Sequence, residues 1–342
     1  MVEMDQVGGR EQTYVVRSDI NSCAGAEAVA VNTASPGGCV IGGKELLVAG
    51  RFLKTASLRS EAHVPLEDPE SFVEKVKQSR FRADIFTFVQ GVNDRTPRYA
   101  FYQETDKLAV LSIATYDHWF NKQLYFKPRN KLRKALKSGI EVRLEEFNDA
   151  LLQGIKAIYD ETPVRQGKRN YHYKKDFETI RREHCAFLDR SQFIAVYYAG
   201  EMIGFAKLTF SQGCGIFMNF LSKVSHRDKA TNNALLAKAV EICAERKVNT
   251  LVYGVWGSGG TPGLVEFKVA NGFECVEVPR YFVPLTVIGR LALKAGVHRG
   301  IVRRVPKRWV EMAAKVRTRW NAFRFKAARP EAEAREHAAQ KK

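Results

Sequence analysis

The order of elements that the sequence predicts between residues 140 and 286 constrains the fold more than any other feature of the chain. Runs with strand patterning alternate with segments of helical periodicity, and turn residues separate them. In chain order these are the strand "IEVRLE", helices in "FNDALLQGIKAIYDET" and "KKDFETIRREHCAFL", strands in "QFIAVYYAG", "EMIGFAKLTFS" and "CGIFMNFLSKV", a helix over 232–246, the strand "VNTLVYGVW", a helix in "TPGLVEFKVANGF" and the strand "ECVEVPRYFVPLT". This order predicts an α/β fold in which helices flank a mixed sheet.

The remaining chain divides into three parts. The sequence predicts a flexible leader over residues 1–45 and a smaller α+β unit over residues 46–126, followed by the larger domain at 127–286. In the smaller unit, "DPESFVEKVKQS" predicts a helix, and "ADIFTFVQ", "YAFYQET" and "LAVLSIATY" predict strands separated by turns such as Asn93-Asp94 and Thr105-Asp106. Residues 287–342 predict a basic, amphipathic helical tail.

Composition narrows the class of protein. The chain has 342 residues, of which 45% are hydrophobic, so it can build a large core. No apolar run approaches the ~20 residues of a membrane span, and the first residues lack the order of a signal peptide, which favours a cytoplasmic location. The six cysteines show no C-x-x-C spacing, so we expect reduced thiols and no metal site.

The positive charge of the chain is concentrated in two segments. The net charge is +18, and the tail after residue 288 carries most of the excess; a second basic block, "KPRNKLRKALKSG", covers 127–139. The tail suits contact with a membrane surface, contact with RNA, or packing of its tryptophan face against the protein itself. The membrane alternative would place the protein at the periphery of the inner membrane. No stable protein partner is implied.

A basic loop precedes the helix in "SHRDKATNNALLAKAVEIC", residues 225–243. Arg227 and Lys229 lie directly before the amino end of this helix, where free N–H groups and the helix dipole favour an anion. The sequence therefore predicts a phosphate-binding loop that follows a buried strand. The alternative is an ordinary helix start, with Asp228 or Thr231 as the N-cap and the cations solvated.

The element order resembles the Gcn5-related N-acetyltransferase (GNAT) fold over residues 140–286. Three local matches support this resemblance: the hairpin "YYAGEMIGFAKL", the basic loop at 225–232, and "EFKVANGFECVEV", which is similar to the family's FYxxxGF ending. The segment "KPRNKLRKALKSGIEV" resembles the linker of FemAB-like transferases and polysaccharide-biosynthesis acyltransferases. That second resemblance implies that residues 46–126 are a partial GNAT-like unit.

The resemblance implies a donor site for acyl-CoA, expected to be acetyl-CoA. Arg227 falls on the arginine of the family's R-x-x-G-x-G/A loop, Ala230 on its first glycine and Asn232 on its last small residue; Asp228, Lys229 and Thr231 complete the loop. Both glycines are missing. A backbone N–H near Asn219 and Phe220 would stabilise the oxyanion. Lys268 occupies the position of the tyrosine that protonates the leaving thiolate in many family members. Tyr253 or Tyr281 could replace that tyrosine if the fold brings them near; the alternative is that the thiolate leaves without a general acid.

The acceptor side is predicted in "YDETPVRQGKRNYHY", residues 159–173. Glu161 could deprotonate an amine if burial raised its pKa, and His172 is the alternative base because its ordinary pKa is near ~6.5. Arg165 could pair with an acceptor carboxylate or phosphate, beside Gln166 and Tyr173. A structural salt bridge between Glu161 and Arg165, and a stacking role for His172, stay open.

Together these observations predict transfer of an acyl group from acyl-CoA to the amine of a small molecule or a cell-envelope precursor. The first alternative is FemAB-like aminoacyl transfer from aminoacyl-tRNA to an envelope precursor. The second is a basic binding module that performs no chemistry.

Overall fold

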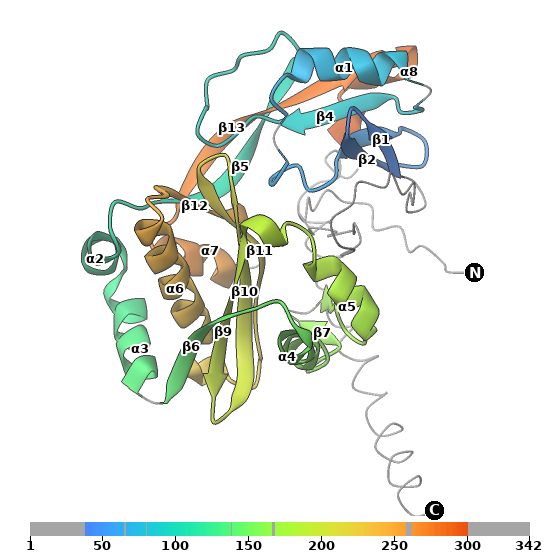
Figure 1. Ribbon diagram of the computed structural model, residues 1–342. Helices are drawn as coiled ribbons and strands as arrows, with labels where there is room; N and C mark the ends of the chain where they lie inside the picture. The colour runs from blue at the N-terminus through green and yellow to red at the C-terminus, as the bar shows by residue number, and fades with distance from the viewer. Residues whose placement is uncertain are drawn as a thin grey trace, which may run out of the picture.

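One mixed sheet of eleven strands organises the protein (Figure 1). The structure, a computed structural model, describes residues 38–64, 66–79, 81–137, 139–165, 168–257 and 262–299. The strand order is β1-β2-β3-β4-β13-β5-β12-β11-β10-β9-β6. The strands are β1 (Gly38–Ile41), β2 (Lys44–Ala49), β3 (Thr55–Leu58), β4 (Ile85–Val89), β5 (Tyr102–Ser112), β6 (Ile140–Glu145), β9 (Ser191–Tyr198), β10 (Glu201–Ser211), β11 (Cys214–Ser222), β12 (Thr250–Val255) and β13 (Glu274–Pro284).

Helices cover both faces of this sheet, as the sequence predicted. They are α1 (Pro69–Gln78), α2 (Tyr116–His118), η1 (Trp119–Gln123), α3 (Phe126–Lys137), α4 (Asp149–Tyr159), α5 (Phe177–His184), η2 (Leu188–Arg190), η3 (Arg227–Lys229), α6 (Thr231–Glu245), α7 (Pro262–Ala270), α8 (Val287–Lys294) and η5 (Val297–Arg299). A separate pair of short strands, β7 (Val164–Arg165) and β8 (Lys168–Arg169), lies in the predicted acceptor segment.

Alternation along β9 shows how one strand supplies two cores. Ile194 and Val196 pack in the cluster that contains α3 and α6, whereas Phe193 and Ala195 pack with α4 and α5. Successive side chains of a strand point to opposite faces, so a nearly continuous apolar run is required of a strand buried on both sides. The α3–α6 layer and the α4–α5 layer are visible on opposite sides of the sheet in Figure 1.

Turn and cap residues place the element ends close to their predicted positions. Asn148 caps α4 through the N–H of Leu151 at 2.9 Å. Gly272 has a φ of +87° just after α7, in the left-handed region that glycine adopts readily. Ala199 and Gly200 both have positive φ between β9 and β10, which is the geometry of a tight hairpin.

The first part of the chain differs from its prediction in two respects. The predicted leader is too long, because β1 and β2 already pair as a hairpin from Gly38. The turn predicted at Thr105-Asp106 is wrong: β5 runs unbroken from Tyr102 to Ser112. Thr105 and Asp106 pair with Pro279 and Val278 of β13, so a long neighbouring strand keeps this polar stretch extended.

β5 and β13 join the two parts of the sheet. β5 lies between β12 and β13, and β13 continues beyond β5 to pair with β4. The expected boundary near residue 126 therefore divides the chain but not the sheet. The leader up to residue 37 and the basic tail after residue 299 lie outside the described residues. Within the described ranges, no helix is long and apolar enough to cross a membrane.

A buried ion-pair cluster holds this junction together. The guanidinium of Arg280, on β13, contacts Glu61 and Asp106 at 2.5 Å each. It also donates a hydrogen bond to Thr87 Oγ1 at 3.2 Å. The three charged side chains are at most 13% exposed, so removing the cation would leave two carboxylates with little solvent to compensate.

We expect Arg280→Met to lower the free energy of unfolding by about 3–5 kcal/mol, the usual penalty for leaving a buried charge unpaired. Urea denaturation followed by circular dichroism measures this change. Arg143→Met is the control, because Arg143 pairs with Glu141 at the surface and its loss should have no measurable effect. A loss below about 1 kcal/mol for Arg280→Met would show that the cluster does not stabilise the junction.

Candidate active site

The candidate site begins where β11 and β12 separate. These parallel strands are paired only from Cys214 to Ile216 and from Thr250 to Val252, although both continue further. The predicted oxyanion residues Asn219 and Phe220 lie on β11 beyond the last pair with β12, where this edge of the strand is free of that partner. Their role in catalysis stays a prediction.

Aromatic rings fill the space between the diverging strands. The Phe220 ring centroid is 4.9 Å from those of Phe217 and Tyr253, and 6.3 Å from that of Phe267 on α7. These rings extend the core that α6 covers. They form an aromatic wall beside the place where β11 and β12 separate.

The amino end of α6 faces this region without a side-chain cap. Ala230, at the position of the family's first glycine, has φ +52° and ψ +31°, so the loop keeps a left-handed conformation without glycine. Neither Asp228 nor Thr231 caps the helix, so the alternative of an ordinary N-cap is wrong. Thr231 is 3% exposed, and its Oγ1 has no hydrogen-bond partner among the described residues; the same holds for Asn232 Oδ1.

The cations of the loop differ in their surroundings. Arg227 is exposed. Lys229 is bonded to Asp228 at 3.1 Å and stands 4.2 Å above the Tyr198 ring, which fixes its ammonium at the end of β9. Because the Asp228 carboxylate repels an anion, Asp228 can bind a phosphate only through its backbone. The helix dipole, Arg227 and Lys229 together favour an anion here.

Buried amides fix the first turn of α6 in place. The Asn233 side chain donates to Asn271 Oδ1 at 3.2 Å, and the Asn271 carbonyl accepts from the indole N–H of Trp119 at 2.9 Å. These contacts connect α6 to the end of α7 and to η1. Asn233 and Asn271 therefore hold the amino end of α6 in place. The sequence did not identify them, because polar residues inside a predicted helix are usually solvated.

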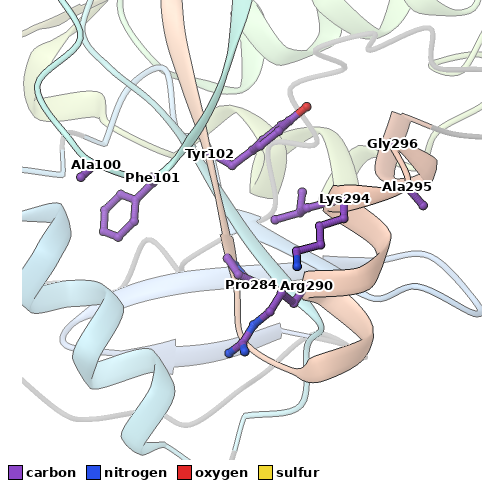
Figure 2. A pocket seen from close by; sticks show the side chains of 9 residues that line it. Ala100, Phe101, Tyr102, Pro284, Arg290, Lys294, Ala295 and Gly296 are labelled. Atoms are coloured by element: carbon purple, nitrogen blue, oxygen red, sulfur yellow. The ribbon is translucent and has the colours of Figure 1, made fainter.

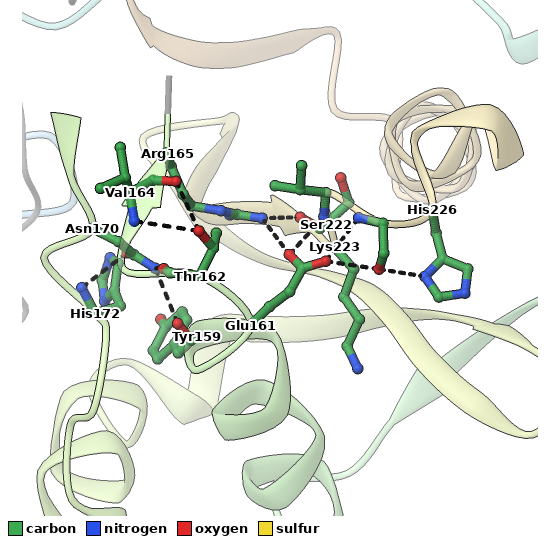
Figure 3. Close-up of polar contacts among 12 residues, drawn as sticks. Tyr159, Glu161, Thr162, Val164, Arg165, Asn170, His172, Ser222, Lys223 and His226 are labelled. Carbon is green, nitrogen blue, oxygen red and sulfur yellow. Dashed lines mark hydrogen bonds and ion pairs between the residues drawn. The ribbon is translucent and has the colours of Figure 1, made fainter. Parts of the chain in front are cut away.

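Glu161 positions the loop between β11 and α6 (Figure 3). Its carboxylate accepts hydrogen bonds from the backbone N–H groups of Val224 at 2.6 Å and Ser225 at 2.8 Å, and from the Ser225 hydroxyl at 2.7 Å. Burial alone would raise the pKa of Glu161, but these bonds and Arg165 outweigh it and lower the pKa. The expectation that burial raises the pKa of Glu161, as a general base needs, is therefore wrong, and three hydrogen bonds already engage its carboxylate.

Arg165 takes part in the same arrangement. Its guanidinium donates to the carbonyl of Ser222 and lies 3.6 Å from the Glu161 carboxylate. The salt bridge with Glu161 that the sequence left open is thus present, and it occupies the group expected to bind an acceptor. Burial lowers the pKa of Arg165, and the nearby Arg227 adds to the shift. Gln166 lies outside the described residues; Tyr173 is half-buried, with the Lys174 ammonium 5.5 Å from its ring centroid.

His172 is a stacking residue. Its ring lies 4.1 Å from the Tyr159 ring at an interplanar angle of 23°. Burial, with contributions from Lys175 and Arg165, lowers its pKa to about 3. The proposal that His172 acts as a base with an ordinary pKa is therefore wrong, because so weak a base cannot hold a proton taken from an ammonium group.

Tyr281 lies away from this region, in the core of the first part of the chain. Its side chain is fully buried and stacks on Phe88 at 5.1 Å. The hydroxyl donates to Gln90 Oε1 and accepts from the N–H of Arg98, both at 2.9 Å. Its assignment as a catalytic acid is wrong, because β13 carries it into the β4–α1 layer.

Lys268 is the residue that the sequence left without a role. It lies on α7, is 1% exposed, and donates to the carbonyl of Val255 at 2.6 Å. Its Nζ is 5.1 Å from the Tyr253 ring centroid, so it borders the aromatic wall between the diverging strands. Burial lowers its pKa to about 8. Among the described residues, no cluster of His, Cys, Asp or Glu could hold a metal ion.

These features define a fold of the GNAT type, with the partial first unit and shared sheet of a FemAB-like arrangement. FemX is similar to this chain with a TM-score of 0.51 and 12% identity, over 78% of this chain and 88% of FemX. L-PGS from Bacillus licheniformis gives a TM-score of 0.48 at 12% identity, over 75% of this chain and 85% of that one. A tandem GNAT protein from the clavulanic acid biosynthesis pathway gives 0.41 at 9% identity, over 71% and 79%. At 12% identity the likeness to FemX concerns the fold.

No protein-family model matches the sequence, and no curated protein matches it.

We expect Glu161→Gln to lower the free energy of unfolding at neutral pH by about 1.5–3 kcal/mol, the range for hydrogen bonds to a charged group. Because the folded-state pKa of Glu161 is lowered, its contribution is present above the ordinary value of 4.5 and is lost as the pH falls through the folded pKa. Urea denaturation across this range measures the difference. Glu178→Gln, at an exposed carboxylate of α5, is the control. A penalty that is the same at neutral and acidic pH would contradict the assignment.

We expect the imidazole resonances of His172 to stay constant between about pH 8 and pH 5, since its pKa is lowered to about 3. Two-dimensional NMR of the histidine rings measures this, and His172→Gln identifies the signal by its loss. A titration midpoint near the ordinary value of 6.5 would restore His172 as a candidate base.

Proposed function

We propose that the protein is an N-acyltransferase that binds a phosphate-bearing, activated acyl donor at the amino end of α6. The observation that carries the proposal is the uncapped helix start, with Ala230 in a left-handed conformation and Arg227 and Lys229 beside it. The reactive carbonyl would then lie where β11 and β12 separate. The acceptor is an amine on a small molecule or on a cell-envelope precursor.

The first donor we propose is acyl-CoA, most simply acetyl-CoA. Its pyrophosphate would accept hydrogen bonds from the first N–H groups of α6. The Glu161 carboxylate supports this site indirectly, because it holds the Val224 and Ser225 backbone next to the loop. The protein would thereby position the donor without glycine in the loop.

The reaction that follows is attack of the neutral amine on the thioester carbonyl carbon. A C–N bond forms, the carbonyl π electrons move to oxygen, and the β11 backbone near Asn219 and Phe220 stabilises the oxyanion. The attacking nitrogen, now positively charged, releases one proton to water; collapse of the intermediate breaks the C–S bond, and the thiolate that leaves takes up a proton. Lys268 is a suitable source, because burial lowers its pKa to about 8, near the ~8.5 of a thiol.

Aminoacyl-tRNA is the second candidate donor, and the surface of α3 favours it. This helix carries six cations and no acidic residue, and Lys127, Lys131, Lys134 and Lys137 are exposed. α3 lies beside α6 (Figure 1) and ends three residues before Ile140. Ile140 pairs with Tyr198, whose ring supports Lys229. A cationic strip leading from the loop suits an extended polyanion better than a single cofactor.

A thermal-shift titration distinguishes these donors. Under the first proposal, acetyl-CoA at about 100 times its dissociation constant stabilises the protein by about 2.7 kcal/mol, and Arg227→Glu with Lys229→Glu removes the effect. Arg246→Glu with Lys247→Glu is the matched control, because it makes the same charge change at the other end of the helix. Under the second, tRNA binds, acetyl-CoA has no effect, and Lys131→Glu with Lys134→Glu weakens tRNA binding.

Two results would contradict the proposed donor site. If neither donor stabilises the folded wild-type protein, or if the loop variant responds to donor as the wild type does, the amino end of α6 is not the donor site. Stabilisation without any acyl transfer to an amine would leave the binding-module alternative.

A further inference from the structure

Four large apolar side chains of two neighbouring segments are exposed. On α8, Val287, Ile288 and Leu291 are 69%, 62% and 60% exposed, and Phe52, in the loop between β2 and β3, is 89% exposed. We name these four residues the α8 surface. The opposite side of α8 is buried, with Ala292 and Leu293 packed on Ile85 and Phe282. The helix is therefore anchored by one apolar face and presents a second apolar face outward.

Asp84 connects the two segments of the α8 surface. Its carboxylate accepts from the N–H of Lys54 at 2.9 Å and from the Thr286 hydroxyl at 2.8 Å, which is the N-cap of α8. Leu53, next to Phe52, packs against the cluster that contains Ala292. The loop and the helix thus form one continuous part of the protein surface.

Cations surround this apolar surface. Arg51, Lys54, Arg290 and Lys294 are exposed, and the sequence of neither segment (50–54 and 287–299) contains Asp or Glu. Arg290 and Lys294 also line a pocket of about 550 Å³ between α8 and the start of β5 (Figure 2). The rest of its lining is mostly apolar and includes Phe101, Tyr102 and Leu293. Exposed apolar side chains ringed by cations are typical of surfaces that lie in the headgroup region of a membrane.

We propose that the α8 surface docks on a membrane of anionic phospholipid, with Arg290 and Lys294 facing lipid phosphates. Charge complementarity favours this occupant over the basic tail and over a second copy of the chain. The chain beyond residue 300 carries thirteen Lys or Arg against four Glu, so covering the surface with that segment would place like charges together. A second copy docking through the same surface would do the same. An anionic bilayer takes up the apolar side chains and neutralises the cations.

Vesicle flotation of the full chain tests this proposal. Wild-type protein should float with vesicles of phosphatidylglycerol and phosphatidylcholine in equal parts, and not with phosphatidylcholine alone. Ile288→Ser with Leu291→Ser should weaken partitioning about tenfold, since two side chains no longer enter the bilayer. The matched control is Phe126→Ser with Leu136→Ser on the cationic α3, where the side chains are 72% and 52% exposed; it should partition as the wild type does.

Four results would overturn the proposal. The first is that the wild type does not bind anionic vesicles, and the second is that the α8 variant binds as tightly as the wild type, which assigns docking to another part of the chain. The third is a lower melting temperature of the α8 variant without vesicles, which shows that these side chains are covered within the chain. The fourth is a wild-type dimer in light scattering that the α8 variant abolishes, which makes a second copy the occupant. This test does not depend on the acyl donor.

Discussion

The carboxylate of Glu161 determines how the candidate site is assembled. It lies just beyond α4, yet its hydrogen bonds go to the backbone of the loop that follows β11. Arg165 reinforces this connection by binding both Glu161 and the last carbonyl of β11. The loop before α6 can therefore leave the helix start without a side-chain cap, because its own conformation is held from the other side of the sheet. A carboxylate with this many partners supports the site as a positioning residue.

Much of the fold could be predicted because the relevant signals are local. The hydrophobic periodicity shows where strands and helices run. The capping residue Asn148 and the turn residues Gly200 and Gly272 show where some of them begin and end. What failed was non-local: β5 looked interrupted at Thr105-Asp106, and only the pairing with β13 and the ion pair with Arg280 show why polar residues continue a strand there. The sequence pattern also could not show that β5 would lie between β12 and β13, two strands of the larger domain.

The site was predicted less well, for a related reason. Residue types pointed to two segments, the loop at 227–232 and the segment after α4, and the structure joins the second to the backbone directly before the first. The roles of single residues depend on burial and partners, which a sequence does not display. Burial makes His172 too weak a base, hydrogen bonds lower the pKa of Glu161, and β13 carries Tyr281 into another core. Lys268, set aside as a departure from a motif, borders the diverging strands.

The most direct measurement of the central claim is an NMR titration of the deuterated full chain with acetyl-CoA, following the backbone amides of α6. The account predicts saturable chemical-shift changes at Thr231 and Asn232, whose N–H groups lie at the helix start, and at Asn233, whose N–H donates to the Ala230 carbonyl in the same turn. Unchanged amides at these three positions, with shifts appearing only elsewhere in the protein, would contradict the assignment of this helix terminus as the acyl-CoA site.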